Sequence, residues 1–224
     1  MHRILSGIRF HPTDPSTAFF RSNLFQPANS WIQGSHIEMI RHLLYQEGFF
    51  HKTGIPKPVL ITPSFYTILN ADAFDSTSWL RSCVRQAGLL QENDLLATTF
   101  LVPVNTGNNS HWILVYLSCE LQHFYPINPL HPLVTCPSDM VIGQTLASAF
   151  ENAFSLGKLT CQIPVICKHF PQQYDSYYCG VFITIYPLEF FDWNLACSKR
   201  YELDMVRLLM LSWMLTNTVP KIQW

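Results

Sequence analysis

Three strand-like segments in the middle of this chain limit its fold more than any other feature. Residues 98–104 are apolar and β-branched and end at the turn-like run 105–109. Residues 111–117 form a second such segment, and residues 121–127 form a third. Because only residues 118–120 join the last two segments, we expect them to pair as an antiparallel hairpin. The sequence therefore predicts an antiparallel unit at the centre of a sheet.

Helical patterns lie before and after these strands. Thr77 or Ser78 can cap one helix and Ser138 another, because their hydroxyl groups can accept from free main-chain N–H groups. Apolar spacing predicts helices at 35–48, 65–69, 77–88, 138–157 and 201–215, and two further short strands at 59–62 and 163–168. Strands in the middle with helices on both sides predict an α+β fold.

Composition indicates a single globular domain with a large core. Of the 224 residues, 48% are hydrophobic and 13% are charged, which is enough to bury a core without cross-links. Residues 1–30 have weak periodicity and are interpreted as an irregular lead-in, and residues 31–224 as one domain. The net charge of −1, with scattered Lys and Arg, predicts no nucleic-acid partner. No apolar run reaches the roughly 20 residues of a membrane span, so we expect no membrane partner.

The cysteine pattern also bears on the compartment. Seven cysteines occur without a C-x-x-C pair, which argues against a zinc ribbon or a disulfide framework and predicts no metal site. Free thiols are typical of a reducing compartment, so we expect an intracellular location in the nucleus or the cytoplasm.

Four side chains could together support a cysteine nucleophile. Such a nucleophile needs a base, a group that orients the base, and donors for the oxyanion. His111 opens the second strand, and Asn128 follows the third at the same end of the hairpin. We expect Nδ1–H of His111 to donate to Asn128, which leaves Nε2 facing Cys179. The amide of Gln173 lies six residues before Cys179. From the residues alone, His111 as a surface residue and Asn128 as a turn residue remain an open alternative.

Two motifs make the resemblance to a known family specific. The chain contains F-L-V-P-V-N at 100–105 followed by His111-Trp112, and P-Q-Q-Y-D-S-Y-Y-C-G at 171–180. These blocks resemble those of the ubiquitin-like-protein-specific cysteine proteases, the SUMO (sentrin) protease family, whose clan includes the adenovirus maturation protease. Weaker matches at 31–37, 64–69 and 204–207 extend the resemblance over about residues 31–215.

The resemblance implies a papain-like cysteine protease fold, with a central mixed or antiparallel sheet packed against helices. It places Cys179 at the N-terminus of a helix. Residues 181–186 would then be helical, although their β-branched residues favour a strand. Pro187 would bend or end that helix.

The resemblance also implies an activity, namely cleavage after the C-terminal Gly-Gly of a ubiquitin-like modifier such as SUMO or ubiquitin. Cys179 would be the nucleophile, His111 the base and Gln173 an oxyanion donor. Trp31 and Trp112 would cover a narrow tunnel that admits only Gly-Gly. No cofactor is implied.

Four departures from the family pattern leave other functions open. Asn128, Tyr178 and Gly34 each replace an Asp, and Asp175 replaces an Asn. An impaired relative that only binds modifiers is one alternative, and a clan-related acetyltransferase or maturation protease is another. A pathogen effector delivered into a host cell is also compatible with the sequence.

Overall fold

The computed structural model describes residues 34, 37, 58–69, 75–86, 96–106, 111–165, 168 and 170–189. The predicted lead-in at 1–30, most of the helix at 35–48 and the last helix at 201–215 lie outside the described residues and stay predictions. The boundary between lead-in and domain likewise stays a prediction.

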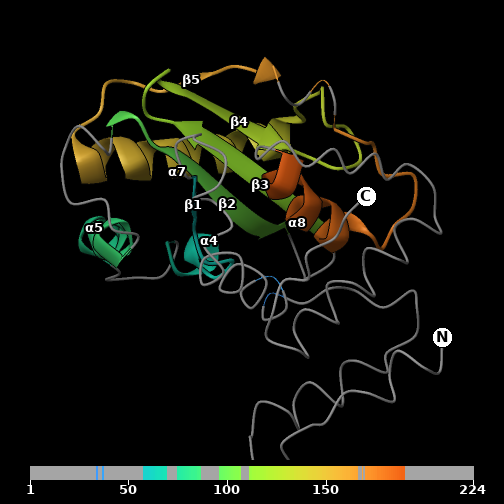
Figure 1. Ribbon diagram of the computed structural model, residues 1–224, viewed down its shortest axis with the longest axis horizontal. Helices are drawn as coiled ribbons and strands as arrows, with labels where there is room; N and C mark the ends of the chain where they lie inside the picture. The colour runs from blue at the N-terminus through green and yellow to red at the C-terminus, as the bar shows by residue number, and fades with distance from the viewer. Residues whose placement is uncertain are drawn as a thin grey trace, which may run out of the picture.

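A five-stranded mixed sheet forms the centre of the described chain (Figure 1). The strands, in spatial as well as chain order, are β1 (Val59–Leu60), β2 (Thr99–Thr106), β3 (His111–Ser118), β4 (His123–Ile127) and β5 (Thr160–Cys161). The three long strands pair antiparallel, and the two short edge strands pair parallel to their neighbours. This sheet with its helices confirms the predicted α+β class.

The register of the central hairpin decides which residues meet at its open end. Leu114 pairs with Ile127, so the first residues of β3 lie beside the chain that leaves β4. Asn105 pairs with Trp112 on the other side of β3. The predicted antiparallel hairpin is thus confirmed, and it places His111 at the same edge of the sheet as Asn128.

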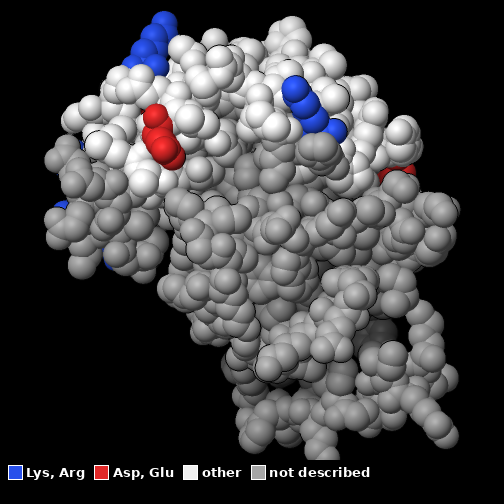
Figure 2. Space-filling view, turned by 45° about the horizontal axis from the view of Figure 1, so that its top comes forward, with Lys and Arg blue, Asp and Glu red and all other residues white. Residues whose placement is uncertain are grey.

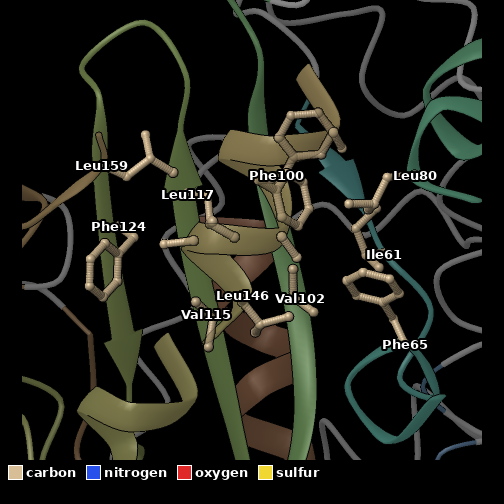
Figure 3. Packing of buried hydrophobic residues seen from close by; sticks show 14 of the residues in the cluster. Ile61, Phe65, Leu80, Phe100, Val102, Val115, Leu117, Phe124, Leu146 and Leu159 are labelled. Carbon is tan, nitrogen blue, oxygen red and sulfur yellow. The ribbon is translucent and has the colours of Figure 1, made fainter. Parts of the chain in front are cut away.

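The main core lies between one face of the sheet and the helix α7 (Pro137–Phe154). Alternate residues of each strand point to this face, as the period of two requires, and Figure 3 shows them meeting Leu146 of α7. The rings of Phe100 and Phe150 lie 4.8 Å apart. Two further helices, α4 (Phe65–Leu69) and α5 (Ser76–Gln86), extend this core past β2.

The helix α8 (Cys179–Glu189) covers the opposite face of the sheet and contacts β3 (Figures 1 and 3). Residues 181–186 are therefore helical, as the resemblance implied and against their β propensity. Burial explains this outcome, since Val181, Phe182 and Ile183 are each 1% exposed and tertiary packing outweighs propensity. Of the bend or end expected at Pro187, the end is wrong, because the helix continues to Glu189, and the bend stays a prediction.

The predicted helix caps are wrong in detail. Asp75, not Thr77 or Ser78, caps α5, and its Oδ1 accepts from the main-chain N–H of Ser78 at 3.0 Å. The N-cap of α7 is Cys136, which makes no side-chain capping bond, and Ser138 lies inside the first turn. A carboxylate can cap as well as a hydroxyl group, and the sequence does not say which neighbouring polar residue lies at the cap.

The predicted strand at 163–168 is also wrong. The edge strand is β5, which ends at Cys161, before the predicted strand begins. Within the predicted strand, the side chain of Val165 is 74% exposed. Strand propensity alone did not place this segment, because an edge residue with little to pack against gains little from pairing.

Gly143 allows α7 to lie close to β4, and this contact gives a test of the packing. A Cβ added there would lie 2.8 and 3.0 Å from two ring carbons of Phe124. Overpacking of a core costs about 1–3 kcal/mol, more than the roughly 1 kcal/mol that Ala gains over Gly in a helix. We expect Gly143→Ala to lower the free energy of unfolding by about 1 kcal/mol in a urea titration. Ser148 is exposed on the same helix, so Ser148→Ala is the control and should not lower the free energy of unfolding. Equal free energies of unfolding in the two variants would contradict the close contact.

Candidate active site

His111 and Asn128 are hydrogen-bonded at the open end of the hairpin. Nε2 of His111 lies 2.9 Å from Oδ1 of Asn128. Asn128 is 7% exposed and follows the last residue of β4. The predicted pair therefore meets, as the antiparallel register requires.

The ring nitrogen that meets Asn128 is not the one expected. The sequence analysis assigned Nδ1 to Asn128, whereas the structure places Nε2 there. The reason lies in the position of Cys179, toward whose sulfur the main-chain N–H of Trp112 donates. The sulfur thus lies close to the first residues of β3. The ring tip reaches Asn128, so Nδ1, the ring nitrogen nearer the main chain, is the one that a reaction with Cys179 would have to use.

The orientation of the Asn128 amide is fixed from both of its ends. Its Oδ1 also accepts from the main-chain N–H of Leu130 at 3.1 Å. Its Nδ2 donates to Oδ2 of Asp139 at 2.8 Å. Because an N–H group demands an oxygen and an ionised carboxylate can only accept, the amide oxygen must face His111. The neutral ring then carries its proton on Nε2.

Asp139 is a residue that the sequence analysis missed. It is 5% exposed and lies in the first turn of α7. An available signal was an acidic residue in the first turn of the predicted helix that follows Asn128, where the helix dipole favours a negative charge. Its contact with Asn128 depends on the path of the intervening loop, which the sequence pattern does not define.

The carboxylate of Asp175 organises the chain just before α8. Its Oδ1 accepts from the main-chain N–H groups of Tyr177 at 2.9 Å and of Tyr178 at 2.8 Å. These bonds hold the turn that presents Cys179 as the first residue of α8. The acid that departs from the family's Asn thus has a structural part in the loop.

The Cys179 thiol is buried, with 0% exposure. Burial raises the pKa of the Cys179 thiol, while main-chain N–H groups of Trp112 and Gly180 act in the opposite direction; the negative charge of Asp175 raises it further. These effects favour the protonated thiol until a base removes its proton. His111 directly precedes Trp112, whose main-chain N–H donates toward the sulfur, and its role as the base stays a prediction.

Gln173 lies six residues before Cys179 in the sequence, and its amide donates to another residue. Nε2 donates to the main-chain oxygen of Asp175 at 2.8 Å and lies 3.1 Å from Oδ1 of the same residue. Oε1 is buried and, among the described residues, has no hydrogen-bond partner. The expected role of Gln173 as an oxyanion donor stays a prediction, and it requires at least one of these N–H groups to leave Asp175.

The segment before α8 is attached to both halves of the site. The main-chain N–H of Gln173 donates to the oxygen of Pro129 at 2.8 Å, and Nε2 of Gln172 donates to the oxygen of Leu130 at 2.7 Å. The hydroxyl of Tyr186 in α8 donates to the oxygen of Pro171 at 2.8 Å. These three bonds connect the chain after β4 with the helix that carries Cys179.

Trp112 is the only one of the two predicted tunnel residues that the structure describes. Its side chain is 5% exposed, and a Cβ at Gly34 would lie 3.4 Å from its ring. Gly34, which replaces the family's Asp, therefore lies against this indole. Trp31 lies outside the described residues, and its role stays a prediction.

The rest of the described surface carries few charges. On the face drawn in Figure 2, Lys and Arg side chains stand apart from one another. In the ranges that the structure describes, no group of three His, Cys, Asp or Glu side chains could hold a metal ion. No helix among the described residues is long and apolar enough to cross a membrane.

The described chain has the α+β fold of the Ulp1-like cysteine proteases. Its structure is similar to the C-terminal protease domain of Ulp1 in complex with Smt3, the yeast ortholog of SUMO. That match has a TM-score of 0.61 at 16% identity and covers 85% of this chain and 79% of the other.

Two further solved structures have the same fold. The Chaetomium thermophilum Ulp1-like SUMO protease catalytic domain gives a TM-score of 0.59 at 14% identity, covering 87% of this chain and 76% of that one. The Xanthomonas campestris effector protein XopD bound to ubiquitin gives a TM-score of 0.54 at 14% identity, and the match covers 95% of this chain and 98% of that one. The sequence matches no protein-family model and no curated protein. The fold expected from the motifs is confirmed.

The charge of Asp175 gives a prediction about the reactivity of the thiol. Because that charge contributes to the raised pKa of Cys179, Asp175→Asn should lower this pKa while keeping an oxygen that can accept from the same N–H groups. The rate of alkylation of Cys179 by iodoacetamide, followed by mass spectrometry across a pH series, should reach half its plateau at lower pH. Glu120→Gln, an exposed acid in the turn between β3 and β4, should leave the curve in place. An unchanged curve in Asp175→Asn contradicts the assigned electrostatic effect.

Proposed function

We propose that this protein is a cysteine peptidase or isopeptidase that cleaves after the C-terminal Gly-Gly of a ubiquitin-like modifier. The observation that carries the proposal is that His111, hydrogen-bonded to Asn128, directly precedes Trp112, whose main-chain N–H donates toward the sulfur of Cys179. The fold shared with proteases whose solved structures contain Smt3 or ubiquitin supports the same class of substrate.

The proposed reaction begins when Nδ1 of His111 removes the proton from Cys179. The thiolate attacks the carbonyl carbon of the last Gly, and the main-chain N–H of Cys179 and Nε2 of Gln173 stabilise the oxyanion. His111 then protonates the leaving amine, which releases it and leaves a thioester. Water activated by His111 hydrolyses the thioester and frees the modifier. The ring of Trp112, together with Trp31, would restrict the approach to residues without side chains.

The proposed activity belongs in a reducing compartment, because a free thiol nucleophile is lost when it is oxidised. We place it inside a cell, in the nucleus or the cytoplasm. Delivery into a host cell is compatible with the similarity to the XopD effector.

The experiment that tests the proposal is a panel of ubiquitin-like modifiers with a C-terminal vinyl sulfone or propargyl group. We expect one or more of them to form a covalent adduct with the protein, seen as a shift on a denaturing gel. Cys179→Ala should abolish the adduct, and Cys119→Ala should not, since Cys119 lies at the far end of β3. Absence of an adduct with every modifier would exclude the proposed substrate class.

A second candidate function is binding of a modifier without turnover. The engagement of Gln173 Nε2 by Asp175 favours it, because an oxyanion donor held elsewhere cannot act. Tight binding of a modifier without adduct formation would support this function over the protease.

The oxyanion role of Gln173 has a matched control in the residue before it. We expect Gln173→Ala to lower kcat on the captured modifier by about 10²–10³, the usual loss for one oxyanion donor, with little change in KM. Gln172→Ala removes a neighbouring amide that donates to Leu130 instead, and should stay within about tenfold of the parent. A kcat in Gln173→Ala equal to that in Gln172→Ala would contradict the assigned role.

A further inference from the structure

Asp139 is a buried carboxylate that the reaction described above does not use. Its side chain is 5% exposed and its Oδ2 accepts from Nδ2 of Asn128 at 2.8 Å. Asn128 in turn meets the ring tip of His111 at 2.9 Å. A chain of two hydrogen bonds therefore connects a buried negative charge to the proposed base.

We propose that Asp139 is a positioning residue for His111, and that it supplies through Asn128 the negative charge that an Asp at position 128, as in the family that the motifs resemble, would place directly beside the histidine. The inference depends on the proposed function only in giving His111 the role of the base. Asn128 transmits the effect because its amide accepts from the ring at one end and donates to the carboxylate at the other.

The geometry of the amide supports this assignment. The main-chain N–H of Leu130 already requires the amide oxygen to face His111, so orientation alone does not need Asp139. What Asp139 adds is charge, because an amide paired with an ionised acceptor is polarised and its oxygen becomes a better acceptor. When His111 takes the proton from Cys179, the resulting imidazolium is stabilised by this polarised oxygen and by the carboxylate behind it.

The distance makes the expected effect measurable. Two hydrogen bonds and one amide group place the carboxylate within about 8 Å of the ring nitrogen. At that separation and an effective dielectric constant of about 20 to 40, a full charge changes the proton affinity of the ring by roughly 6- to 30-fold. Other titratable groups near this chain of bonds are Cys179 at the start of α8, Asp175 in the loop before it, and His131, whose main-chain N–H donates to the main-chain oxygen of Asn128.

The experiment measures the protonation of His111 without any substrate. Cys179→Ala serves as the parent, so that the thiol no longer titrates, and the ring Cε1–H signal of His111 is the one absent in His111→Gln. In Cys179→Ala/Asp139→Asn we expect the titration midpoint of this signal to move about one pH unit lower, since the charge is lost. Glu120→Gln in the same parent removes an exposed acid and should leave the midpoint in place.

The exchange of the two side chains provides the rescue. Asn128→Asp/Asp139→Asn has one amide and one carboxylate, as the natural chain has, but with the carboxylate directly on the ring. We expect its midpoint to rise at least to that of the parent. Asn128→Asp alone brings two carboxylates into contact, and like charges at this distance cannot both be ionised. Its thermal unfolding midpoint at pH 7 should therefore be lower than that of the exchanged pair.

A midpoint that does not move in Asp139→Asn, or an exchanged pair that titrates like Asp139→Asn, would overturn the proposal. Because these readouts involve no modifier, they stand or fall independently of the substrate assignment. If a modifier is captured and turned over, the acid limb of the pH profile of kcat should move to lower pH in Asp139→Asn, because the base His111 then becomes protonated only at lower pH.

Discussion

The antiparallel pairing of β3 with β4 is the constraint on which the candidate site depends. Leu114 opposite Ile127 brings the start of one strand to the end of the other, and only this register puts His111 within reach of Asn128. A slip of one residue would turn every side chain of β3 to the other face of the sheet. The burial of β3 between α7 and α8 opposes such a slip, because both faces of the strand pack against apolar side chains.

The sequence predicted the central hairpin well because strand pairing of neighbouring segments is local. A link of three residues favours antiparallel pairing of the two strands, and the contact of His111 with Asn128 follows from that pairing. The turn before α8 could not be predicted from the sequence in this way. That Asp175 accepts from Gln173, Tyr177 and Tyr178 depends on a loop conformation for which no periodic pattern exists. The contact of Asp139 with Asn128 depends on a loop in the same way.

Two predictions illustrate where local reasoning and tertiary context conflict. Residues 181–186 favour a strand by propensity, yet burial against β3 makes them a helix that places Cys179 at its N-terminus. The ring nitrogen assigned to Asn128 was also wrong, because that assignment depended on where the sulfur lies relative to the main chain of Trp112. Spacing along the sequence can predict which residues meet in a site, whereas which ring nitrogen of a histidine makes a contact depends on the three-dimensional structure.

The bonds from Gln172 and Gln173 to the chain after β4 have a consequence for how such a protein diverges. The proposed base and its partners come from one stretch of the chain, 99–154, and the proposed nucleophile from a second, 170–189. The distance between the proposed base and the proposed nucleophile therefore depends on the hydrogen bonds that join these two stretches. The bond from the main-chain N–H of Gln173 to Pro129 would survive a change of that side chain, whereas the bond from Nε2 of Gln172 to Leu130 would not, so this connection depends on the side chain at position 172.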